Sequence, residues 1–171
     1  GHTWSSEAFP KGQPTKDLKS KTIEDARNNI VAMFDSIAKY SGKAGGEDGQ
    51  AGLVTGPGRT ILVDANGMEY AQLIDKGIMG SCFYYSATSS YLSDNKIGDA
   101  VDNIIIEEGK GTAKEHHFDE AFGYFGAPID FPTSIYGASF WAKYCNKMDA
   151  VAGTNEIMNS FIKGRTAISN K

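Results

Sequence analysis

Apolar residues recur at three- and four-residue spacing over residues 20–42, with charged and amide side chains between them. This period matches the α-helix, so the segment predicts an amphipathic helix with one buried face. A second helix is predicted from Gly67 to about Leu92, with Asn66 as a candidate N-cap. Beyond Lys76 this segment carries no charged residue, which indicates a helix that other helices enclose.

Three further helices are predicted in the second half of the chain. Thr112 and Glu115 have the Thr-x-x-Glu spacing of a capping box, which begins a helix by pairing side chains with backbone N–H groups. Gly126, followed closely by proline, ends that helix near Phe125. The next helix runs from near Tyr136 to Met148, and the last begins at Thr154 and reaches about Ser169.

The remaining segments predict little regular structure. Residues 42–58 are rich in glycine and predict a long connecting loop, without the Gly-Lys-Ser/Thr ending of a phosphate-binding loop. Residues 60–63 give at most one strand, and the isoleucines at 104–106 fit either a helical turn or a short strand. Residues 1–19 predict an extended arm. We therefore predict an all-α fold, a bundle of about five or six helices over residues 20–171 with little or no strand.

Projection of residues 112–125 on a helix separates two groups of side chains. Phe118, Phe122 and Phe125 fall within about 60° of one another and form an aromatic stripe. His116, His117 and Glu120 fall within about 100° on the opposite side. The small residues Ala113 and Gly123 lie one turn away from this trio, so we expect another helix to cover it and both faces to be buried.

A buried cluster of two imidazoles and a carboxylate can be satisfied in three ways. His117 and Glu120 have the spacing by which helices present a metal-binding pair, His116 with Asp119 offers a second pair at the same spacing, and His116 with Glu120 offers a third at four residues. The cluster would suit a divalent ion such as iron or zinc. Alternatively, Glu120 fixes an imidazole tautomer for acid–base chemistry, or the cluster is a structural hydrogen-bond network. Further candidate ligands, which local spacing does not place, are Glu69, Asp75, Asp64, Tyr84 and Tyr85.

Charge and composition exclude some classes of protein. The net charge is −4 and basic residues do not cluster, which argues against a nucleic-acid surface. The uncharged stretch 77–91 is too short for a transmembrane span. No serine has the context of a hydrolase nucleophile. Cys82 and Cys145 could pair in an oxidising compartment, although apolar helices also favour buried thiols.

Four segments resemble one uncharacterised family of bacterial envelope lipoproteins, found chiefly in Bacteroidota and carrying a domain of unknown function. They are VDANGMEYAQLIDKGIMGSCFYY (63–85), EHHFDEAFGYFGAPIDFP (115–132), FWAKYCN (140–146) and IMNSFIKGRTAI (157–168). Members of that family often accompany imelysin-like proteins, which are helical and are linked to iron or haem acquisition. Of the imelysin signature Gly-x-His-x-x-Glu, His117 and Glu120 match, and Glu115 stands in place of the glycine.

The resemblance implies an imelysin-like bundle in the periplasm or at the outer-membrane surface, lipid-anchored in the full-length protein. Because similar proteins continue past residue 168, the chain is expected to correspond to an N-terminal portion, with a second helical half or a partner chain completing the site. The favoured function is an envelope binding protein for metal or haem uptake, with ligands at His116, His117, Asp119 and Glu120. The alternatives are a metallopeptidase of imelysin type and a structural or interaction module without a ligand. A non-enzymatic role is favoured.

Overall fold

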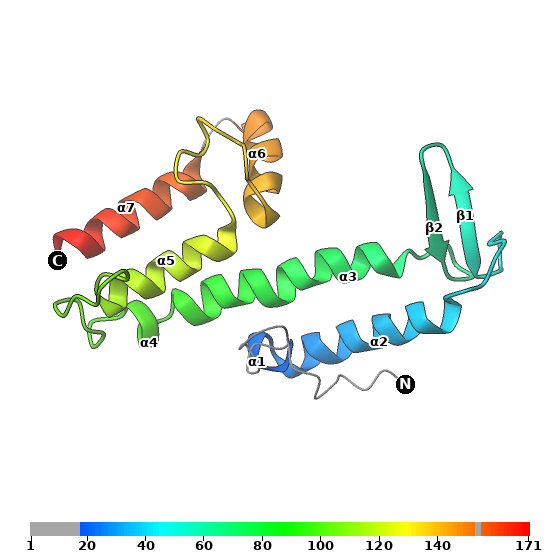
Figure 1. Ribbon diagram of the computed structural model, residues 1–171, viewed down its shortest axis with the longest axis horizontal. Helices are drawn as coiled ribbons and strands as arrows, with labels where there is room; N and C mark the ends of the chain where they lie inside the picture. The colour runs from blue at the N-terminus through cyan, green and yellow to red at the C-terminus, as the bar shows by residue number, and fades with distance from the viewer. Residues whose placement is uncertain (1–17, 153–154) are drawn as a thin grey trace. The chain divides into compact units, whose positions relative to one another are not determined.

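The computed structural model describes residues 18–152 and 155–171 (Figure 1). Residues 1–17 of the predicted arm, and the predicted N-cap Thr154, lie outside the described residues. Contacts between residues divide the chain into two compact units, Gly1–Cys82 and Phe83–Lys171. The single domain predicted for residues 20–171 stays a prediction, because a compact unit need not fold as an independent domain.

The first unit contains three helices and a β-hairpin. Its elements are α1 (Leu18–Lys21), α2 (Glu24–Tyr40), β1 (Gly52–Gly56), β2 (Arg59–Val63) and α3 (Tyr70–Ile78). Helix α2 packs on α3, and both contact β2. Ile30 is buried on the apolar face of α2. Other buried side chains of this unit are those of Val63, Ile74 and Met79. The predicted amphipathic helix over residues 20–42 is therefore present, although it begins four residues later.

The glycine-rich segment contains a strand that the sequence did not reveal. Strand β1 pairs antiparallel with β2, from Gly52 opposite Val63 to Gly56 opposite Arg59. On its other side, the Gly46 N–H donates to the Leu53 carbonyl over 2.8 Å. A Cβ atom at Gly46 would lie 2.7 Å from the Gly52 carbonyl oxygen, so glycine permits this close approach. The prediction of a long loop and at most one strand is wrong, because residues 52–56 form a second strand through backbone hydrogen bonds to β2.

The second unit is built around α5. It contains α4 (Asp94–Ile97), α5 (Ala113–Phe125), α6 (Phe140–Ala152) and α7 (Glu156–Asn170), together with the π-helical segment η2 (Ser86–Tyr91). Helix α5 contacts η2, α4, α6 and α7. Thr112 and Glu115 form the predicted capping box, and Gly126 ends the helix at a φ of +83°. Those predicted boundaries of α5 are confirmed.

An aromatic cluster forms the core of the second unit. The ring centroid of Phe161 on α7 lies 5.8 Å from that of Phe118, 5.3 Å from that of Phe122 and 5.4 Å from that of Phe125. The predicted Phe118–Phe122–Phe125 stripe is therefore confirmed as a packing surface. Offset and edge-on aromatic contacts of this kind add to the stabilisation that burial provides.

The long helix predicted for residues 67–92 is not a uniform α-helix. Helix α3 passes into two π-helical segments, η1 (Met79–Tyr84) and η2. The wider π turns have the same apolar composition as an α-helix, so hydrophobic spacing does not distinguish them. The three isoleucines at 104–106 form neither the helical turn nor the strand considered for them, and each is at least 70% exposed.

The fold-class prediction is wrong in two respects. The described residues hold seven α-helices rather than five or six, and they include a two-stranded antiparallel sheet. An imelysin-like bundle with little or no strand is therefore not what this chain forms. Helices still predominate, because most apolar residues follow the helical period. No helix among the described residues is both long enough and apolar enough to cross a bilayer.

Two glycines in helices provide a test of this packing. A Cβ atom at Gly164 on α7 would lie 2.6 Å from the Phe118 ring, whereas a Cβ atom at Gly123 on α5 would meet nothing within 4 Å. Gly164→Ala should lower the free energy of unfolding by about 1–2 kcal/mol, because overpacking outweighs the gain in helix propensity. Gly123→Ala should raise it by up to about 1 kcal/mol. Urea denaturation measures both, and equal effects would contradict the described packing.

Candidate functional site

His117 is held by α4. Its Nδ1 lies 2.8 Å from the backbone carbonyl oxygen of Lys96, to which an Nδ1–H group donates. In that tautomer Nε2 accepts a hydrogen bond from Lys96 Nζ, 3.3 Å away. Both imidazole nitrogens therefore have partners in the protein, as in a structural network. A metal ion on either nitrogen would have to displace one of these contacts.

His116 and Glu120 form a separate pair on the surface of α5. His116 Nε2 lies 3.9 Å from Glu120 Oε2, with side chains 42% and 34% exposed. The centroids of the two imidazole rings lie 6.1 Å apart. The predicted trio is thus divided into a histidine that contacts α4 and an accessible His–Glu pair.

The expectation that another helix covers this face of α5 holds for His117, which α4 contacts, but is wrong for the part with His116, Glu120 and Gly123. Gly123 is exposed, and nothing lies within 4 Å of the position of its missing Cβ. Ala113 is partly exposed as well. A small residue in a helix permits close packing but does not require it, which is why this inference failed.

Asp119 faces α7 and belongs to a different cluster, centred on Arg165. Arg165 Nε donates to Asp119 Oδ1 over 2.7 Å, and Arg165 Nη1 donates to Glu115 Oε1 over 2.8 Å. Ser169 Oγ donates to the same Glu115 oxygen over 2.9 Å. The guanidinium therefore joins two carboxylates of α5 to α7, one turn apart on α5. This arrangement removes Asp119 from the predicted metal site.

Further hydrogen bonds extend the Arg165 cluster toward the start of α5. The Thr112 N–H donates to Glu115 Oε2 over 2.9 Å, and Thr112 Oγ1 donates to Asn103 Oδ1 over 2.7 Å. The Asn103 amide in turn donates to the Ile168 carbonyl on α7 over 2.8 Å. The Thr112 N–H, Ser169 and Arg165 together lower the pKa of Glu115 to about 2.

Sequence reasoning identified Glu115 only as a capping residue and did not select Arg165 or Ser169. These two lie four residues apart on the last helix, so they share a face. No local spacing reveals their partners, which lie about 50 residues earlier in the chain. The presence of one arginine in the last predicted helix was the only local signal.

An open groove adjoins this cluster between α5 and α7, which lie side by side in Figure 1. We call it the α5–α7 groove. Its apolar end is lined by Phe122, Ile129, Met158, Phe161 and Ile162, and its polar end by Asp119, Arg165 and Ser169. Ile129 is 90% exposed and Ile162 is 51% exposed, so the apolar end is open to solvent. The groove joins an uncovered apolar surface to a charged one.

The other predicted ligand residues do not join these clusters. Glu69 belongs to the first unit, where Oε2 accepts from Arg59 Nη2 over 3.1 Å. Tyr84 is 59% exposed and its ring lies edge-on to Trp141, with centroids 6.1 Å apart. Tyr85 is partly buried. Among the described residues, no three His, Cys, Asp or Glu side chains are placed to hold a metal ion.

Asp64 and Asp75, considered as additional ligands, also have other partners. The backbone N–H groups of Met68 and Asn66 donate to Asp64 Oδ1 over 2.9 and 2.8 Å. These bonds, led by that of Met68, lower the pKa of Asp64 and shape the turn before α3. Asp75 pairs with the adjacent Lys76. Cys82 and Cys145 both carry thiols, and burial raises the pKa of the Cys82 thiol.

These features define a mainly helical protein with a β-hairpin, an aromatic core and an open groove beside an ion-pair cluster. The chain belongs to the DUF4856 family, a domain of unknown function, whose family model matches residues 12–171. No curated protein matches the chain, and no solved structure matches it. The family assignment agrees with the resemblance to a domain of unknown function.

The low pKa of Glu115 predicts an acid-sensitive contribution to stability. A carboxylate whose pKa falls from 4.5 to about 2 on folding stabilises the folded state fully only above the unfolded value. That contribution should be lost as the pH falls from about 4.5 toward 2. Glu115→Gln should therefore flatten the decline in stability over this range, measured by urea denaturation at a series of pH values.

Glu108→Gln provides the control, because Glu108 is exposed in the loop before α5. It should retain the wild-type decline in acid. If both glutamine variants retain that decline, Glu115 does not carry the acid sensitivity.

Proposed function

We propose that this protein is a binding protein rather than an enzyme, and that the α5–α7 groove receives its ligand. The observation that carries the proposal is an apolar hollow, open to solvent, that ends at charged side chains. Ligand sites are commonly apolar concavities with a few polar groups that orient the ligand. The exposure of Ile129 at its rim supports this use, because burial by a ligand would remove apolar surface from water.

The size of the groove suits a small organic ligand. The hollow at its apolar end measures about 290 Å³, and the overlapping, more open hollow toward Ser169 and Asn170 measures about 650 Å³. Both parts share Asp119, Phe122, Ile129, Arg165 and Thr166, so they form one continuous hollow. Small-molecule sites commonly fall in the range of roughly 300–1,000 Å³. An elongated ligand could place an apolar body at one end and a polar group at the other.

The polar end of the groove favours a cationic group. Two carboxylates, Glu115 and Asp119, surround the single guanidinium of Arg165. The exposed half of the Asp119 side chain leaves this carboxylate accessible. The C-terminal end of α7, at Asn170, adds the negative end of a helix dipole. We therefore propose an amphipathic ligand with an apolar chain and a basic head group.

The place of action is part of the same proposal. The resemblance to envelope lipoproteins of Bacteroidota supports binding in the periplasm or at the outer-membrane surface. In that setting the protein would hold its ligand for uptake or transfer without changing it chemically.

A series of ligands that share one alkyl chain tests the groove. Dodecylamine, dodecanol and dodecanoate, each below its micelle concentration, should bind in that order of decreasing affinity by calorimetry. Ile129→Ser/Ile162→Ser should weaken dodecylamine binding by roughly tenfold or more, because two apolar contacts are lost. Asp119→Asn should reduce the preference for the amine over the alcohol.

Ile104→Ser/Ile105→Ser is the matched control, since these isoleucines are 77% and 70% exposed and do not line the groove. This variant should bind dodecylamine as the wild type does. Equal losses in the two double variants, or tighter binding of dodecanoate than of dodecylamine, would refute the proposed site.

A second candidate function, metal binding for iron or haem acquisition, is favoured by the accessible His116–Glu120 pair. Nε2 and Oε2 lie 3.9 Å apart, four residues apart on α5, and both side chains are partly exposed. Imidazole and carboxylate are both ligands of divalent ions. Two protein ligands leave coordination positions for water or for a metal-bearing ligand. The association of similar proteins with imelysin-like proteins supports this candidate.

Titration with Zn²⁺ separates this candidate from a structural role for the histidines. His116→Ala/Glu120→Gln should abolish Zn²⁺ binding measured by calorimetry while changing stability little. His117→Ala should retain Zn²⁺ binding but lower the free energy of unfolding by about 1–3 kcal/mol, since it leaves polar groups of Lys96 unpaired. Zn²⁺ binding that survives in the double variant would exclude the His116–Glu120 pair.

A further inference from the structure

The outward face of α6 is apolar, in contrast to the usual helix of a soluble protein. Phe140, Tyr144 and Met148 follow one another at four-residue intervals and are 44%, 36% and 64% exposed. Residues four apart lie on the same side of a helix. Ala142, on the opposite side, is fully buried. The helix packs through Ala142 and through the Phe140 ring, which lies edge-on to Phe83 with centroids 4.4 Å apart, while Tyr144 and Met148 extend the apolar stripe outward.

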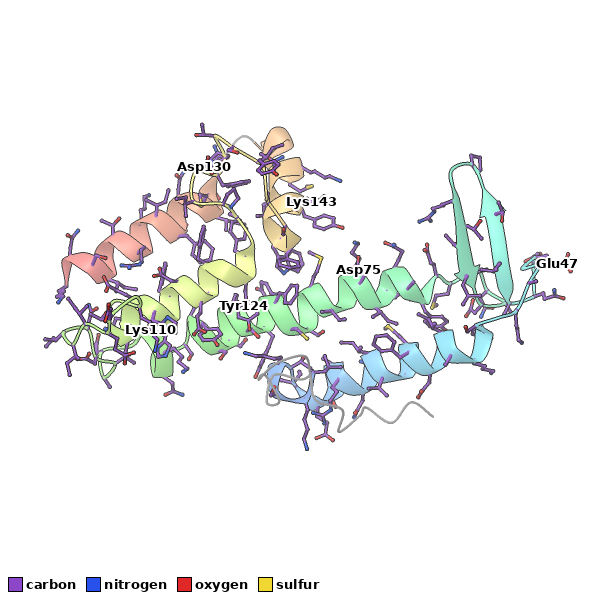
Figure 2. The ribbon with its side chains drawn as sticks, viewed as in Figure 1. Glu47, Asp75, Lys110, Tyr124, Asp130 and Lys143 are labelled. Atoms are coloured by element: carbon purple, nitrogen blue, oxygen red, sulfur yellow. The ribbon has the colours of Figure 1, made fainter. Side chains whose placement is uncertain are left out.

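Two lysines lie beside this apolar stripe. Lys143 and Lys147 are exposed on the same half of α6, and Lys143 is labelled on this helix in Figure 2. Lys147 Nζ lies 5.8 Å from the centroid of the Tyr144 ring. Long lysine side chains can lie along an apolar surface while their ammonium groups reach polar surroundings. The outward face thus combines an apolar centre with a cationic flank.

The segment before α6 adds further exposed apolar side chains. Ile135 is 56% exposed and Tyr136 is 91% exposed. Tyr84, whose ring packs edge-on to Trp141 of α6, is 59% exposed. We call the outward face of α6, together with Ile135 and Tyr136, the α6 face. Its apolar side chains include Tyr, which prefers surfaces where an apolar and an aqueous phase meet.

The charge of this segment differs in sign from that of the whole chain. Helix α6 contains Lys143, Lys147 and Asp149, which give it a formal charge of +1, whereas the net charge of the protein is −4. A cationic patch on an acidic protein attracts an anionic partner by local charge complementarity. Exposed aromatic and methionine side chains flanked by lysine are also the composition of helices that lie in the surface of a bilayer.

We propose that the α6 face binds the surface of an anionic lipid membrane. Helix α6 would lie parallel to the bilayer, with Tyr144 and Met148 among the head groups and upper acyl chains. Lys143 and Lys147 would contact lipid phosphates. Apolar burial and attraction of lysines to anionic lipid act together in this mode of binding. The contact requires no membrane-spanning helix, and it is independent of the ligand proposed for the α5–α7 groove.

Vesicle cosedimentation tests the proposal with the whole chain. The protein should bind vesicles made of equal parts phosphatidylcholine and phosphatidylglycerol more tightly than vesicles of phosphatidylcholine alone. Added salt should weaken the binding, because it screens the lysines. Lys143→Gln/Lys147→Gln should weaken binding to the anionic vesicles about 30-fold, or roughly fivefold for each lysine.

Two further variants distinguish the α6 face from non-specific attraction. Tyr144→Ser/Met148→Ser should weaken binding to the anionic vesicles while leaving the charge unchanged. Lys163→Gln/Lys171→Gln removes the same charge from exposed positions at α7 and should bind as the wild type does. Circular dichroism would confirm that each variant folds.

The proposal would be overturned if the protein does not bind anionic vesicles at low ionic strength. The α6 face would then be a candidate surface for a protein partner. Equal weakening by the two lysine pairs would also overturn the proposal, because binding would then depend on charge anywhere on the surface. If Tyr144→Ser/Met148→Ser binds anionic vesicles as the wild type does, the apolar stripe does not contact the membrane and the proposal fails.

Discussion

The second unit depends on the insertion of Phe161 from α7 among the aromatic side chains of α5. This one ring lies within 6 Å of the rings of Phe118, Phe122 and Phe125, measured between centroids. It brings α7 close enough to α5 for Arg165 to reach Glu115 and Asp119. Without that packing, the two carboxylates would face water and the α5–α7 groove would have only one wall. Both the ion pairs and the candidate site therefore depend on the aromatic contact between α5 and α7.

The polar side chains on different sides of α5 contact different neighbouring elements. Carboxylates that face α7 are bound to Arg165, whereas His117 faces α4 and is bound to Lys96. His116 and Glu120 lie between these contacts and stay accessible. Residues that are adjacent in the sequence thus have different roles, because successive side chains on a helix point about 100° apart. His117 and Glu115, in contrast, already have their polar atoms bound by neighbouring elements.

The two candidate surfaces of the second unit differ in chemistry. The α5–α7 groove has the half-exposed Asp119 carboxylate beside its apolar end, next to an Arg165 guanidinium that also pairs with Glu115, so we propose that it favours a cationic head group. The α6 face carries Lys143 and Lys147 beside exposed apolar side chains, so it favours an anionic surface. Opposite local charge allows one compact unit to hold a ligand and a membrane surface without competition between them.

The elements that depend on local chemistry could be predicted from the amino-acid sequence. Helical spacing placed α2 and α5, the Thr112–Glu115 capping box marked the start of α5, and the phenylalanine spacing identified its packing face. Strand β1 and the long-range polar contacts, in contrast, depend on tertiary packing. Strand β1 forms through backbone pairing that glycine composition does not encode, and Arg165 meets its carboxylates across about 50 residues. Whether His116, His117 and Glu120 act together also depended on neighbouring helices, because spacing shows which side chains share a face but not what that face meets.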